Sequence, residues 1–200
     1  MNENWFHRVR PDGHTEMTIR ILPGIILLVV NTGIDQFEAY LLQQSITRKA
    51  QKTIEHFPYI QAENQAAAKQ TAIVLATAYT MTQTNQARNL LQMLSLTPSE
   101  QWRKSSNGRT PNAHTLELTE TIKLRCNKVR QNTFEIKLYK LQSHQRDIIF
   151  LKTFIAYDPT SACETGYQLT HRYLNEQIEH WGKLSDALTK ISAREVIVHV

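Results

Sequence analysis

Two cysteines are the side chains of this sequence with the most versatile chemistry, because a thiolate is both a nucleophile and a metal ligand. Cys163 is expected close to a helix N-terminus, where the helix dipole lowers a thiol pKa, and Cys126 ends the apolar face of an expected strand. Neither cysteine has a partner at metal-ligand spacing, and no oriented base can be identified for either. We therefore interpret both as core residues, either as free thiols, which suit a reducing compartment, or as a single bridge.

Histidines and carboxylates of the last third of the chain are the next candidates for chemistry. Glu176 and His180 are four positions apart and share one helix face, whereas His171 and His180 are nine apart and point to opposite sides. These histidines cannot chelate one ion, and the pattern favours a surface ion pair. Because no nucleophile motif and no glycine-rich phosphate loop is present, we predict no catalytic residue, no metal site and no cofactor.

The positive charge of the chain is concentrated in one region. The formal net charge is +5, yet residues 1–100 carry eight Lys and Arg against eight Asp and Glu. Residues 101–157 carry eleven against four, and residues 158–200 carry four against six. Such a local excess of cations is typical of proteins that bind a polyanion.

Alternating strands after residue 114 would display many of these cations on one exposed sheet face, with a basic loop beside it. Lys and Arg contact phosphates, and an aromatic ring can stack on an unpaired base. The predicted nucleic-acid or polyanion surface consists of Trp102, Arg103, Lys104, Arg109, Lys123, Arg125, Lys128, Arg130, Lys137, Tyr139 and Lys140. The alternative is an ordinary solvated sheet face, on which lysine and threonine are common.

The strands that would position these residues follow from period-two alternation of apolar and polar side chains. We predict strands over residues 15–21, 25–30, 115–126, 133–141, 147–157 and 195–200. Residues 147–157 are almost continuously apolar, which predicts a strand covered on both faces. Pro23 and Gly24 are expected to bend one continuing strand rather than to close a hairpin.

Helical spacing of apolar residues predicts helices over residues 34–57, 61–79, 84–96 and 161–191. Thr84 is the expected N-cap of the third helix, and Ser161 with Glu164 has the pattern of a capping box for the fourth. Residues 99–112 are expected to form a loop. We predict a single α+β domain over residues 1–200, with a mostly antiparallel sheet, several helices packed on one face, a long C-terminal helix, and residues 1–14 as an N-terminal arm.

The longest apolar run, residues 21–30, is shorter than a membrane span and is interrupted by Pro23 and Gly24. We expect a cytoplasmic protein without a transmembrane segment. The favoured function is a non-enzymatic binding or regulatory protein for nucleic acid or another polyanion. An adaptor or assembly subunit with an acidic protein partner is the alternative, and homo-oligomerisation stays open. A second alternative is a small-ligand carrier or enzyme with a pocket near Tyr167, His171 and Tyr173.

Overall fold

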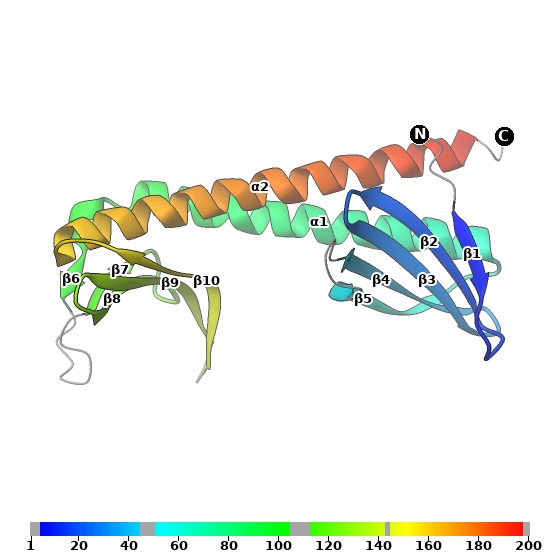
Figure 1. The fold of residues 1–200 in the computed structure, drawn as a ribbon. Coiled ribbons are helices and arrows are strands. Elements are labelled where there is room, and N and C mark those ends of the chain that lie inside the picture. The colour runs from blue at the N-terminus through cyan, green and yellow to red at the C-terminus, as the bar shows by residue number, and fades with distance from the viewer. Residues whose placement is uncertain (1–4, 45–50, 105–112, 143–144, 198–200) are drawn as a thin grey trace. The chain divides into compact units, whose positions relative to one another are not determined.

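A computed structural model describes residues 5–44, 51–104, 113–142 and 145–197 of the chain. In this described part, each half contains five strands followed by one long helix (Figure 1). The first half contains β1 (Phe6–Val9), β2 (Thr15–Leu22), β3 (Ile25–Gly33), β4 (Gln36–Gln44), β5 (Gln51–Gln61) and α1 (Gln65–Leu96). The second contains a 3₁₀ turn (Ser99–Gln101), β6 (Arg103–Lys104), β7 (Ala113–Glu117), β8 (Ile122–Arg130), β9 (Thr133–Gln142), β10 (Gln145–Ile155) and α2 (Pro159–Ile197).

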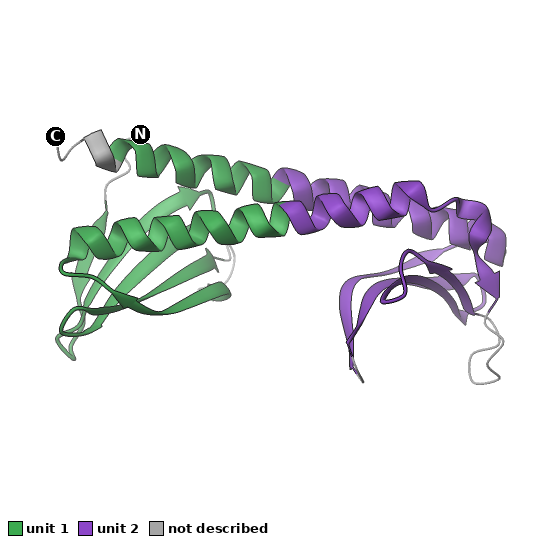
Figure 2. Ribbon diagram, turned by 180° about the vertical axis from the view of Figure 1, so that it is seen from behind, with its two compact units in different colours: residues 1–84, 180–200 green, residues 85–179 purple. Residues whose placement is uncertain are grey.

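The chain divides into two compact units, each with its own antiparallel sheet (Figure 2). Unit 1 comprises residues 1–84 and 180–200, and unit 2 comprises residues 85–179, so that both α1 and α2 contribute to each unit. The α+β class and the long C-terminal helix are confirmed. The described residues form two sheets and two α-helices rather than one sheet with several helices. The prediction of a single domain stays a prediction.

The sheet of unit 1 has the order β1-β2-β3-β4-β5, in which every strand pairs with its neighbour in sequence. Every second residue of β2 from Met17 to Ile21 is buried, as the alternation predicted. Residues 25–30 of β3 are buried at all positions but Leu28, as expected for a continuously apolar central strand. Pro23 and Gly24 form a two-residue turn, because Leu22 pairs directly with Ile25. The predicted continuing strand is therefore wrong: Gly24 adopts a φ of +77°, which a tight Pro-Gly turn needs.

The helix predicted over residues 34–57 is wrong, because its described part consists of β4, residues 51–57 of β5 and the turn before β4. Phe37 and Leu41 suggested a helix because they are four positions apart. Four is also an even number, and Phe37, Ala39 and Leu41 all face the core from alternate positions of one strand. The spacing of these few apolar residues was therefore compatible both with the two-residue period of a strand and with the 3.6-residue period of a helix.

Helix α1 is continuous where two helices were predicted. Asn64 caps its N-terminus by accepting a hydrogen bond of 2.9 Å from the amide of Ala67. Thr84, the predicted cap of a second helix, instead donates its hydroxyl to the carbonyl of Thr80, 2.8 Å away. The threonines that indicated an interruption satisfy their hydroxyls within the helix.

The sheet of unit 2 has the order β10-β9-β8-β7-β6. Strand β9 is confirmed at the predicted position, but the strand predicted over residues 115–126 is a hairpin of β7 and β8. Thr119 closes this hairpin, since its hydroxyl accepts a hydrogen bond of 2.9 Å from the amide of Ile122. The edge strand β10 is largely exposed, so the prediction that it is covered on both faces is also wrong.

Helix α2 begins at Pro159, and Asp158 is its N-cap instead of the predicted Ser161 capping box. The carboxylate of Asp158 accepts the amides of Thr160 at 2.8 Å and of Ser161 at 2.9 Å, and these bonds lower its pKa. The helix extends to Ile197, so residues 195–197 are not part of the predicted terminal strand, and residues 198–200 lie outside the described part. None of the described helices has the length and apolarity that crossing a membrane requires.

Candidate functional site

One face of the unit 2 sheet is packed against helices and the other is open. Residues directly opposite each other on neighbouring strands project to the same face, so the register assigns each side chain to a side. Leu124 and Leu138 are partners and both lie in the core, which identifies the packed face. The adjacent row therefore lies on the other side, which we call the open face; it contains Thr115, Arg125, Lys137 and Leu151.

The next row on the open face contains Glu117, Lys123, Tyr139 and Ile148. Arg103 joins the face as the partner of Thr115 on β6, and Arg130 lies at its end opposite Thr133. Three strands in register thus bring cations that are far apart in the sequence onto one surface.

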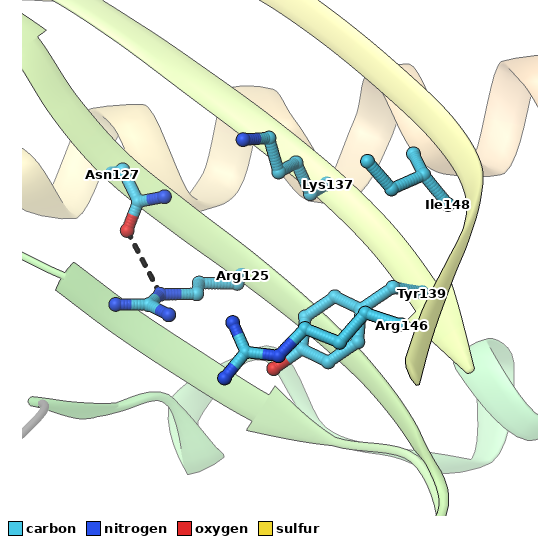
Figure 3. Close-up of a pocket in the computed structure, with 6 residues that line it drawn as sticks. All are labelled: Arg125, Asn127, Lys137, Tyr139, Arg146 and Ile148. Atoms are coloured by element: carbon cyan, nitrogen blue, oxygen red, sulfur yellow. Dashed lines mark hydrogen bonds between the residues drawn. The ribbon is translucent and has the colours of Figure 1, made fainter. Parts of the chain in front are cut away.

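A shallow hollow of about 120 Å³ lies on this face, lined by Arg125, Asn127, Lys137, Tyr139, Arg146 and Ile148 (Figure 3). The guanidinium of Arg125 donates to Asn127 Oδ1 at 2.9 Å. The guanidinium carbon of Arg146 lies 5.5 Å from the centroid of the Tyr139 ring, within the range of a cation–π interaction. Three cationic side chains therefore border one hollow, which is an arrangement suited to an anionic group.

Two carboxylates on the open face neutralise part of its charge. Lys123 contacts Glu117, and Lys137 Nζ lies 2.7 Å from Glu135 Oε1. The hydrogen bond from Lys123 lowers the pKa of Glu117, so this carboxyl stays ionised at neutral pH. Arg146 has no carboxylate within ion-pair distance in the described part of the chain. The face consequently keeps a net positive charge.

The structure brings together about half of the predicted surface. The residues on the open face are Arg103, Lys123, Arg125, Arg130, Lys137 and Tyr139. Lys104, Lys128 and Lys140 lie on the packed side, opposite His114, Phe134 and Ile122 respectively. Trp102 packs against the core, and Arg109 lies outside the described residues.

Tyr139 and Arg146 differ most from what the sequence indicated. The Tyr139 side chain was predicted as an exposed stacking surface, but the residue is only 7% exposed and its ring lies beneath Arg146. Arg146 was missed because the apolar run that follows it, from Ile148 onwards, concealed the alternation of β10. Its partner across the strand pair is Leu141, and that register could not be deduced from sequence.

Tyr167 and Tyr173, proposed to line a pocket, have packing roles. The Tyr167 hydroxyl donates to the carbonyl of Leu94 at 2.9 Å, and the Tyr173 hydroxyl donates to the carbonyl of Ile149 at 3.2 Å. The Tyr173 ring also stacks on Phe150 with centroids 4.5 Å apart. Burial raises the pKa of both phenols, which keeps them neutral hydrogen-bond donors.

Unit 1 has a separate polar cluster on its own sheet. Glu38 accepts a hydrogen bond from the Tyr40 hydroxyl, and His56 Nε2 lies 3.2 Å from the same carboxylate. The rings of Tyr40 and His56 stack with centroids 4.4 Å apart. The hydrogen bond from Tyr40, supported by His56, lowers the pKa of Glu38, and the same bond raises the pKa of Tyr40.

We expect the Glu38→Gln substitution to weaken the dependence of stability on acidic pH. The pKa of Glu38 is lowered in the folded chain, so the ionised carboxyl stabilises the fold above its ordinary value of 4.5 and this contribution is lost as the pH falls further. Urea unfolding should show the variant to be less stable than the wild type at pH 7, and the difference should shrink as the pH falls through the lowered pKa of Glu38. Glu63→Gln, at an exposed position, is the control; equal pH profiles for wild type and Glu38→Gln would contradict the expectation.

Comparison of the chain with protein-family models, with curated proteins and with solved structures finds no match.

Proposed function

We propose that this protein is a non-enzymatic binding protein that engages nucleic acid through the open face of unit 2. The main support for this proposal is that Arg125, Lys137 and Arg146, which lie on three different strands, border the same hollow. A phosphate is the anionic group that a nucleic acid would present there, and it would accept hydrogen bonds from both guanidinium groups.

The composition of the open face favours contacts to the backbone of the nucleic acid over reading of its sequence. Tyr139 is covered by Arg146, so an aromatic platform for unpaired bases is not offered at this position. Ile148 and Leu151 are 56% and 49% exposed and lie next to the cations on the same face, where base surfaces could pack against them. We therefore propose sequence-independent binding of a single strand, in a cytoplasmic setting that suits two free cysteines.

A titration of the purified protein with a fluorescein-labelled single-stranded oligonucleotide, followed by fluorescence anisotropy, tests this function. The affinity should fall linearly on a plot of log Kd against log salt concentration, with a slope of roughly two to four released counterions if three to five phosphates are contacted. A duplex of the same sequence and heparin are the comparison ligands. Absence of binding at low salt, or equal binding of heparin, would contradict the nucleic-acid assignment.

An adaptor function is the second candidate, and it is favoured by the exposed edge of the unit 2 sheet. Strand β10 is an edge strand, and Ile155 on it is 80% exposed. Unpaired backbone groups along such an edge can pair with a strand of another protein. Light scattering over a range of protein concentrations would detect self-association, and a constant monomer mass would exclude this edge as a homo-oligomer contact.

A further inference from the structure

Cys126 and Cys163 meet in the core of unit 2, although they are distant in the sequence. Cys126 lies on the packed face of β8 and is 1% exposed, and Cys163 lies near the start of α2 and is 5% exposed. Both are free thiols of the same apolar cluster. We call them the thiol pair.

The close approach of α2 to the sheet explains why these thiols meet. A Cβ atom added at Gly166 would lie 2.8 Å from Ile136 Cδ1, so the helix backbone nearly touches this row of the sheet. Ile136 is the direct cross-strand partner of Cys126, and Cys163 precedes Gly166 by three residues, on the same helix face. The interaction between the two thiols lowers the pKa of Cys126 and, together with burial, raises that of Cys163.

A cavity of about 330 Å³ in unit 2 reaches Cys163 of the thiol pair. Cys163, His114 and Trp102 are among the residues that line it. His114 is also the cross-strand partner of Cys126, and burial is the main cause that lowers its pKa, so its imidazole is neutral and able to accept a proton. The indole N–H of Trp102 is buried and has no hydrogen-bond partner in the described part of the chain.

We propose that Cys126 and Cys163 form a reversible intramolecular disulfide when a small peroxide enters this cavity. The thiolate of one cysteine attacks a peroxide oxygen, the O–O bond breaks, and a sulfenic acid and hydroxide form. The sulfur of the second cysteine then displaces hydroxide from the sulfenic acid, and the S–S bond forms. Overall two thiols lose two electrons and two protons, and hydrogen peroxide becomes two molecules of water. A thiol reductant reverses the reaction by disulfide exchange.

The disulfide would join the middle of β8 to the beginning of α2, two elements that are separated by β9 and β10 in the chain. Closing a loop of this length restricts the unfolded chain, and we expect the midpoint of thermal unfolding to rise by roughly 10 °C. The proposal is independent of the nucleic-acid function, because neither cysteine lies on the open face.

The test is treatment of the reduced full-length chain with hydrogen peroxide, followed by intact mass spectrometry and a non-reducing peptide map. We expect a mass decrease of about 2 Da, one cross-linked peptide containing Cys126 and Cys163, a higher unfolding midpoint, and reversal of all three by dithiothreitol. Cys126→Ser and Cys163→Ser should each lose the cross-link and the stabilisation, and the wild-type measurement stands by itself if a variant does not fold. Oxidation to sulfinic acids without a cross-link, a disulfide between two molecules, or two unmodified thiols after exposure would each overturn the proposal.

Discussion

We expect that replacing Lys137 and Arg146 together by glutamate lowers the affinity for a single-stranded oligonucleotide by about 100-fold at low salt and reduces the salt slope by roughly two. Both side chains border the hollow on the open face, and the substitutions turn two cations that are proposed to bind phosphate into carboxylates that would repel it. Arg125 would then be left between two acidic neighbours. Anisotropy titrations at several salt concentrations measure both quantities.

The matched control is the Lys128→Glu, Lys140→Glu double variant. It changes the net charge by the same amount in the same unit, but both lysines are exposed residues of the packed side. If the open face is the binding surface, this control should retain an affinity within about threefold of the wild type, because long-range attraction between exposed charges is weakened by salt. Equal losses in the two variants would show that net charge alone governs binding and would contradict the assignment to one face.

Gly166→Val should destabilise the protein by about 3 kcal/mol, the upper part of the range for overpacking a tight core. A Cβ at this position would lie 2.8 Å from Ile136 Cδ1 and 3.1 Å from Ile136 Cγ1, so either the helix or Ile136 must move. The branches of valine make the collision worse than a single methyl group would. Urea unfolding monitored by circular dichroism gives the change in free energy.

Gly182→Val is the control for this substitution, since Gly182 is also a glycine of α2 and a Cβ there meets nothing within 4 Å. Valine has a slightly higher helix propensity than glycine, so the control should be as stable as the wild type or more stable by a few tenths of a kcal/mol. A stability loss at Gly182 equal to that at Gly166 would mean that valine in the helix, and not the contact with Ile136, causes the effect.

The elements that were predicted correctly are those whose apolar residues fit either the strand or the helix period, but not both. Strands β2 and β9 alternate without ambiguity, β3 is a continuous apolar run, and the apolar stripe of α2 repeats over many turns. Residues 34–57 were assigned to a helix because a spacing of four fits both a strand and a helix. The turn at Pro23–Gly24 was missed because L-proline at the first turn position was expected to disfavour a hairpin. The turn at Thr119 was missed because alternation continues on both sides of it.

Only part of the basic surface was predicted, because the sequence shows alternation within a strand but not the register between strands. Alternation within β8 correctly separated Lys123 and Arg125 from the core, and register confirmed that Lys137 joins them. Lys128 was placed wrongly because the strand was predicted to end at residue 126. Strand β8 continues to Arg130, and Lys128 lies opposite Phe134 on the packed side. Arg146 lines the hollow because β10 pairs with β9. Its position could not be predicted without knowing the order and register of the strands.

Nucleic acid is proposed to bind on the open face of unit 2. The most direct measurement is a titration of the isotope-labelled protein with the single-stranded oligonucleotide, followed by amide and arginine side-chain chemical shifts in two-dimensional NMR spectra. We expect the largest changes at Arg125, Asn127, Lys137 and Arg146, and little change at Lys128 and Lys140. Changes centred on the packed side or on unit 1, with the hollow unaffected, would contradict this proposal.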